Sequence, residues 1–101
     1  MPVKLIQVSP SKIPGRGGSS LIHVATTEKQ HQLLLACGAS RDQQYDDFWF
    51  VNIDRSSLTV QSVVSLNPTE RDGFTARNSM TAVLDTPNKK VVFFGGIDSE
   101  H

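Results

Sequence analysis

The chain has too few cysteines, too little net charge and too short apolar runs for several classes of protein. Cys37 is the only cysteine among 101 residues, so no internal disulfide can form and a thiolate-ligated metal site is not expected. Ten basic residues balance ten acidic ones, and without a Lys or Arg cluster we expect no nucleic-acid or membrane partner. No apolar run approaches membrane-spanning length, and residues 1–6 lack the features of a signal peptide. These absences predict a cytoplasmic protein.

The residue types that usually carry catalysis do not form a recognisable pattern. His23, His31 and His101 have a spacing that matches no metal motif. Ser19 and Ser20 follow glycines, but they lack the strand-to-helix context of a nucleophile elbow. We therefore expect no cofactor, no metal and no enzymatic activity from the residues of this chain.

Short strands are the dominant pattern in what the chain does contain. Runs of Val, Ile, Leu and Phe alternate with clusters of Gly, Pro, Asn, Asp or Ser, which is typical of strands joined by turns. No segment has a helical period. We predict an all-β fold with strands at residues 3–8, 20–26, 32–37, 48–53, 58–64, 81–84 and 91–94.

The connections between these strands are of two lengths. Three long connections are expected at residues 10–18, 38–47 and 67–77, whereas the other strands are joined by tight polar turns. If consecutive strands are antiparallel, the long connections fall on one edge of the sheets and the short turns on the other.

One sequence pattern occurs twice. Residues 16–20 and 33–38 form the first copy, and residues 77–81 and 91–96 form the second. Arg16 lies 61 residues before Arg77, and Gly38 lies 58 residues before Gly96. A pattern repeated in step is typical of architectures that stack one supersecondary unit beside near-copies of itself.

These features resemble the kelch repeat, the four-stranded blade of a family of β-propellers. A kelch blade begins with an Arg and small polar residues, its second strand ends in paired glycines, and its third strand is aromatic. The matching residues are Arg16, Arg77, Gly95, Gly96 and the segment 46–54. The first copy departs from the pattern, because Cys37 precedes Gly38 where two glycines are typical. We expect Cys37 to be buried because it is small and apolar.

The resemblance implies a kelch-type β-propeller of four-stranded antiparallel blades, with an incomplete ring in this chain. Residues 1–9 would form the outer strand of a neighbouring blade, residues 16–65 a complete blade, and residues 74–101 the first half of the next. A blade has two apolar faces, so it needs a neighbour on each side. On this interpretation the sequence is a piece of a longer propeller.

Several residues are expected to hold the blades in place. Paired glycines permit a sharp turn with positive φ, and each arginine is expected to bond backbone carbonyls or an acidic side chain, with Asp47 the best-placed acid. Trp49 belongs to an aromatic strand with apolar side chains on both faces. The expected structural residues are Arg16, Gly38, Asp47, Trp49, Arg77, Gly95 and Gly96.

The resemblance also implies a function, namely a scaffold that binds a protein partner through its long loops. Loops on a rigid framework commonly carry binding, and Tyr and Arg are enriched at interfaces. The candidate partner-binding residues are Lys12, Arg41, Gln43, Tyr45, Arg71 and Phe74.

Three alternatives to a simple scaffold remain open. The first is a propeller-based enzyme whose catalytic residues lie outside this chain. The second is an adaptor subunit of a ubiquitin ligase. The third is a subunit whose open strand edges are completed by self-association or by another chain.

Overall fold

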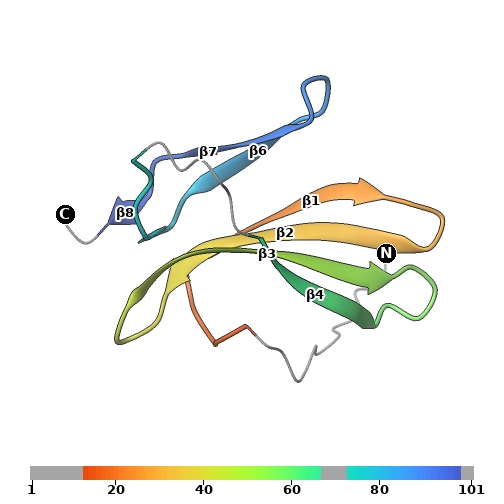
Figure 1. Ribbon diagram of the computed structural model, residues 1–101, viewed down its shortest axis with the longest axis horizontal. Coiled ribbons are helices and arrows are strands. Elements are labelled where there is room, and N and C mark those ends of the chain that lie inside the picture. The colour runs from red at the N-terminus through yellow and green to blue at the C-terminus, as the bar shows by residue number, and fades with distance from the viewer. Residues whose placement is uncertain (1–12, 67–72, 99–101) are drawn as a thin grey trace, which may run out of the picture.

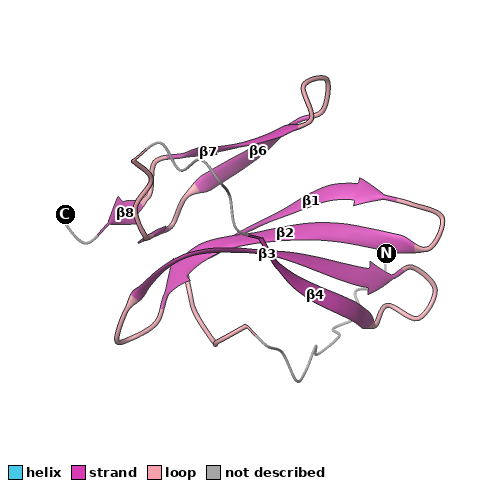
Figure 2. Cartoon of the chain, in the orientation of Figure 1, coloured by secondary structure: helices cyan, strands magenta, loops and turns pink. Residues whose placement is uncertain are grey.

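The computed structural model describes residues 13–66 and 73–98, and every regular element among them is a strand (Figure 2). The all-β prediction is therefore confirmed. No helix in this described part of the chain is long and apolar enough to cross a membrane. The first four strands form one antiparallel sheet in chain order: β1 (Ser20–Thr26), β2 (Gln30–Ala39), β3 (Gln44–Asp54) and β4 (Val60–Leu66).

The second half of the chain forms two smaller antiparallel pairs. The strands β6 (Thr81–Asp85) and β7 (Lys90–Phe94) make a hairpin, and the short strands β5 (Arg77–Asn78) and β8 (Ile97–Asp98) pair at its base. The sequence pattern predicted the hairpin but not the β5–β8 pair. The strand expected at residues 3–8 lies outside the described residues.

The strands β2 and β3 extend further toward their shared turn than the sequence predicted. Residues 38–47 were expected to form a long connection, but only residues 40–43 lie between these two strands. A β-bulge lies within this extension: Ala36 pairs with Phe48 and Gly38 with Tyr45, so Cys37 of β2 faces two residues of β3, Asp46 and Asp47. The extra residue is therefore in β3, and β2 continues past the positive-φ residues Cys37 (φ 59°) and Gly38 (φ 110°) to Ala39 instead of ending at the glycine.

The turn between β3 and β4 is held by Asp54. Its Oδ1 accepts hydrogen bonds from the backbone N–H groups of Ser56 (2.9 Å) and Ser57 (2.8 Å). These bonds lower the pKa of Asp54 below its usual value, and the bond from the Ser57 backbone has the largest effect. Leu58 has φ 57° in this turn, which explains why β4 begins at Val60 rather than at residue 58, where the sequence pattern placed it.

The hairpin packs on one face of the β1–β4 sheet (Figure 1). Leu34, Ala36, Cys37 and Phe48 form the buried core between them. The Phe48 ring lies 5.7 Å from the Phe93 ring, measured between centroids. Cys37 is fully buried, so the expectation of a buried thiol is confirmed.

The turns separate onto two ends of the sheet, as antiparallel order requires. The β1–β2 and β3–β4 turns lie at one end, and the β2–β3 turn lies at the other, near β5 and β8 (Figure 1). We call the end that carries the β2–β3 turn, residues 40–43, the turn-40 edge.

Candidate functional site

The ion pair between Arg16 and Asp47 lies at the base of the turn-40 edge. The Arg16 side chain is only 3% exposed, and its Nη1 donates to the Asp47 carboxylate and to the Cys37 carbonyl (3.2 Å). Its guanidinium also lies 3.7 Å above the centre of the Tyr45 ring. Arg16 therefore ties the segment before β1 to Cys37 of β2 and to the bulge at the start of β3.

Asp47 is ionised and well bonded in this arrangement. Its second oxygen accepts a 2.9 Å hydrogen bond from the indole N–H of Trp49. Burial by itself raises the pKa of Asp47, but the hydrogen bonds from Arg16 and Trp49 and the charge of Arg16 outweigh burial and hold the pKa below its usual value. Arg16 Nη2 is buried and has no hydrogen-bond partner within the described residues.

The second copy of the sequence pattern repeats the backbone contacts of the first. Arg16 Nε donates to the carbonyl two residues earlier, at Pro14 (3.1 Å), and Arg77 Nε donates to the carbonyl of Thr75 (3.1 Å). Arg77 Nη1 donates to the Gly95 carbonyl (3.3 Å), as Arg16 does to Cys37. The repeat is therefore present in three dimensions as well as in the sequence.

The two copies differ in how the arginine charge is satisfied. Arg77 donates from Nη2 to the Thr75 hydroxyl (2.9 Å) and lies 4.8 Å from the centre of the Phe74 ring. Within the described residues Arg77 forms no ion pair, in contrast to Arg16 with Asp47. The second copy therefore has the same arginine-to-carbonyl bonds without an ion pair to Arg77 among the described residues.

A close approach of the chain explains why Gly38 and Gly96 are glycines. A Cβ on Gly38 would lie 2.4 Å from Ser19 Oγ and 2.9 Å from the Gly17 carbonyl oxygen, and a Cβ on Gly96 would lie 2.7 Å from Met80 Cγ. Both glycines also have positive φ, 110° and 93°. The second position of each pair therefore excludes any side chain.

The first position of each pair is less restricted. Gly95 has φ 76°, but a Cβ built on it meets nothing within 4 Å. Cys37 occupies the corresponding place in the first copy with φ 59°. The replacement of the first glycine by cysteine costs backbone strain but creates no clash.

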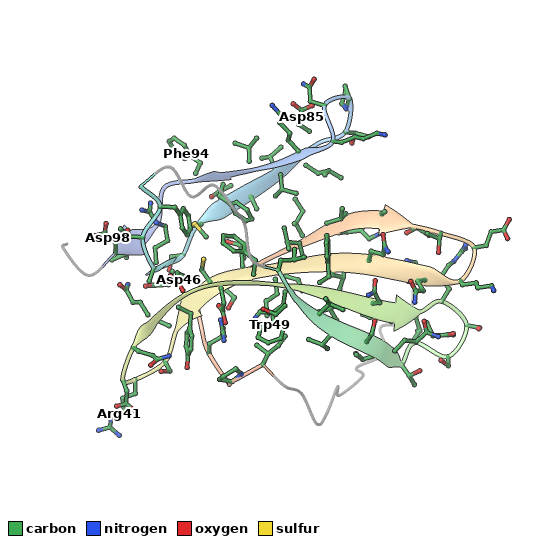
Figure 3. All side chains as sticks on the ribbon, in the orientation of Figure 1. Arg41, Asp46, Trp49, Asp85, Phe94 and Asp98 are labelled. Carbon is green, nitrogen blue, oxygen red and sulfur yellow. The ribbon has the colours of Figure 1, made fainter. Side chains whose placement is uncertain are left out.

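Two of the six candidate partner-binding residues lie exposed at the turn-40 edge. Arg41 and Gln43 flank the tip of the β2–β3 turn, and Figure 3 shows Arg41 pointing away from the sheet. A shallow depression here also includes Ala76, so the edge combines residues from both halves of the chain. Gln44 joins the halves directly, since its Nε2 donates to Asn78 Oδ1 (2.8 Å) and to the Ile97 carbonyl (2.9 Å).

Two other candidates have rings that pack against residues of the chain itself. Tyr45 belongs to β3, and its ring is covered by Arg16. Phe74 is half-buried, with its ring 5.6 Å from that of Phe48. The prediction that Tyr45 lies in a connection is therefore wrong, whereas Phe74 does lie outside the strands, before β5. Lys12 and Arg71 lie outside the described residues.

A polar depression at the opposite end of the sheet was not predicted. Gln30 Nε2 donates to Gln61 Oε1 (2.6 Å), and Gln61 Nε2 donates to Asp54 Oδ2 (3.0 Å). The sequence pattern places Gln30 and Asp54 in two separate turns and Gln61 in a strand, and only the antiparallel order brings them together. The residues that line it are Thr27, Glu28, Lys29, Gln30, Asp54, Ser56 and Gln61.

The described residues contain no group of three or more His, Cys, Asp or Glu side chains that could hold a metal ion. No protein family, curated protein or solved structure matches the chain. The geometry of the turn-40 edge is therefore the main guide to function.

Proposed function

We propose that the two repeats are kelch-type β-propeller blades and that the chain binds a protein partner at the turn-40 edge. The observation that supports this proposal is the repeated arginine arrangement, in which Arg16 and Arg77 each donate to the residue before the second glycine. A repeated, internally bonded loop base provides a rigid support for the exposed residues at the tip. Loops on such a framework are common binding sites.

The chemistry of the edge is suited to a polar protein surface. Arg41 carries a charged, exposed guanidinium, and Gln43 adds an exposed amide with both donors and an acceptor. The depression between them and Ala76 is shallow, whereas small-molecule sites bury most of their ligand. We place the encounter in the cytoplasm, because the single thiol suits a reducing compartment.

Quantitative affinity purification would test the proposal. The tagged chain is compared with R41A/Q43A, which removes both side chains of the turn-40 edge, and with E28A/K29A, which changes the turn at the opposite end of the sheet. We expect at least one protein to be recovered with the wild type and with E28A/K29A but to be depleted about tenfold with R41A/Q43A, the loss of roughly 1.4 kcal/mol of binding free energy.

Purified components then distinguish a direct contact from an indirect one. The protein so identified is titrated against each purified variant by isothermal calorimetry, after circular dichroism has verified that the variants are folded. Equal recovery of every associated protein with R41A/Q43A and the wild type would refute binding at this edge.

A further inference from the structure

The β1–β4 sheet and the β6–β7 hairpin expose opposite faces of the same repeated unit. Ile22, Leu34 and Ala36 lie on the face of the first sheet that the hairpin covers. The corresponding residues of the second copy are Val83, Val92 and Phe94, at spacings of 61 residues for the first strand and 58 for the second. We call these three residues the hairpin outer face.

Exposure reverses between the two copies. Leu34 is 6% exposed and Ala36 is 0% exposed, whereas their counterparts Val92 and Phe94 are 52% and 80% exposed. A surface that is core in the first copy is therefore open to solvent in the second. Exposed apolar residues that form a contiguous group are typical of an interaction surface.

On the opposite surface of the β1–β4 sheet, residues are exposed in the first copy and packed into the core in the second. Leu21, Leu35 and Trp49 are cross-strand neighbours on the face away from the hairpin, and we call them the sheet outer face. Leu21 is 60% exposed. The counterpart of Leu35 is Phe93, which contacts the Phe48 ring in the core.

These two outer faces therefore correspond to the two halves of the contact that already exists inside the chain. Within the chain, the inner face of the hairpin covers the inner face of the β1–β4 sheet. The hairpin outer face corresponds to the covered side of that contact, and the sheet outer face corresponds to the covering side. By their positions in the repeat, the hairpin outer face and the sheet outer face are therefore counterparts of the two surfaces that already pack together inside the chain.

One molecule does not bring its own outer faces together, because they lie on opposite sides of the stack. Figure 3 shows Phe94 on the side of β7 away from the β1–β4 sheet, and Trp49 on the side of that sheet away from the hairpin. A formal net charge of zero provides no general repulsion between copies.

We propose that the hairpin outer face of one chain docks on the sheet outer face of a second copy, in a head-to-tail arrangement. This contact continues the internal stacking of the two sheets. Because the two surfaces differ, the interface is heterologous, and repeated docking produces a ring or a filament rather than a closed two-fold dimer. The proposal is independent of partner binding at the turn-40 edge.

Sedimentation velocity across a concentration series tests this arrangement. The wild-type chain is expected to form species larger than the 11.1 kDa monomer. F94D places a charge on the hairpin outer face, and L21D places one on the sheet outer face. A head-to-tail contact needs both faces intact, so neither variant alone is expected to assemble. L58D adds the same charge to the β3–β4 turn, outside both faces, and is expected to assemble like the wild type.

Mixing the two variants provides the decisive measurement. The L21D chain keeps an intact hairpin outer face and the F94D chain keeps an intact sheet outer face, so an equimolar mixture is expected to form a species of two copies that does not grow further. An isologous contact, in which each face meets its own copy, cannot be restored by mixing. A mixture that stays monomeric while the wild type assembles would overturn the head-to-tail arrangement.

Circular dichroism verifies that each variant retains the β-structure of the wild type. The neutral variant F94T is measured alongside F94D in case the charge prevents folding, and it is expected to weaken association by about tenfold or more through loss of buried apolar area. A folded wild-type chain that remains monomeric over the whole concentration range would refute the proposal. So would an F94T chain that assembles as readily as the wild type.

Discussion

The first and second copies of the repeated pattern have the same loop geometry but different support. In the first copy Arg16 is buried and paired with Asp47, and its sheet has four strands. In the second copy Arg77 donates to carbonyls and to a hydroxyl, and its hairpin has two strands. Both copies have the arginine-to-carbonyl bonds and a positive-φ glycine, whereas the ion pair is a feature of the first copy.

A two-stranded hairpin is marginally stable by itself. The β6–β7 hairpin therefore depends on its contact with the first sheet, through Phe93 against Phe48 and through the Ser20 hydroxyl, which donates to the Met80 carbonyl (2.8 Å). We expect the two copies to respond unequally to matched substitutions.

The largest difference is expected between the two arginines. R16A removes a buried cation and leaves Asp47 without its ion pair, so we expect it to lower the free energy of unfolding by about 3–5 kcal/mol. R77A removes more exposed hydrogen bonds and is expected to cost about 1 kcal/mol. Urea denaturation followed by circular dichroism measures both variants, and equal losses would show that the ion pair is not what distinguishes the copies.

The glycines should rank next. G38A forces a Cβ to within 2.9 Å of a backbone oxygen at positive φ, and we expect a loss of roughly 3 kcal/mol from strain and overpacking. G95A meets no such contact and is expected to cost about 1 kcal/mol for its positive φ alone. The same denaturation assay compares them, and a loss for G95A as large as that for G38A would contradict the close approach at Gly38.

The charge of Asp47 should make the stability of the first copy depend on pH. Its folded-state pKa is below the ordinary value of 3.8, so the carboxylate stabilises the fold fully above that value and loses the effect as the pH falls through the folded-state pKa. At neutral pH, D47N is expected to be less stable than the wild type by about 1–2 kcal/mol. The gap should narrow in urea titrations below pH 3.8.

A matched measurement isolates Asp47 from the other carboxylates. D85N changes an aspartate at the end of β6 and serves as the control for the loss of one carboxylate. If the gap between D47N and the wild type stays constant as the pH falls, Asp47 is not stabilised in its ionised form.

The smallest loss of stability is expected from removing the Gln44 hydrogen bonds that join the two copies. Q44A removes the two hydrogen bonds from Gln44 to Asn78 and Ile97 and should cost about 1 kcal/mol. Hydrogen exchange should increase mainly in peptides from β5 to β8, whereas β1 and β2 keep their protection. Q43A, one residue earlier and exposed, serves as the control, and equal exchange in both variants would show that Gln44 does not couple the two halves.

Local patterns in the sequence were sufficient to predict the strand content and the repeat. Short β-branched runs bounded by turn residues predicted most of the strands, because a strand depends largely on residues within it. The spacing of Arg16 and Arg77 predicted two equivalent units, and Asp47 lies against Arg16 in the structure. The kelch resemblance remains a proposal.

The errors occurred where contacts between distant residues decide the structure. Tyr45 was predicted in a loop because Gly38 marked the end of a strand, but β2 continues to Ala39 and a bulge in β3 opposite Cys37 lets Tyr45 pair with Gly38. The β5–β8 pair has only two residues in each strand, too few for any sequence pattern. The polar depression beside Asp54 depends on two turns that meet only in the folded sheet.

The sequence by itself determined the all-β class, the repeated unit and the positions that require glycine or arginine, because these follow from backbone conformation and short-range periodicity. Only the tertiary structure decided which face of each sheet is covered. The period of a strand places apolar residues on a face, but Leu34 and Val92 occupy the same place in the repeat and differ in exposure. That difference is set by whether another sheet packs on the face, which local periodicity cannot specify.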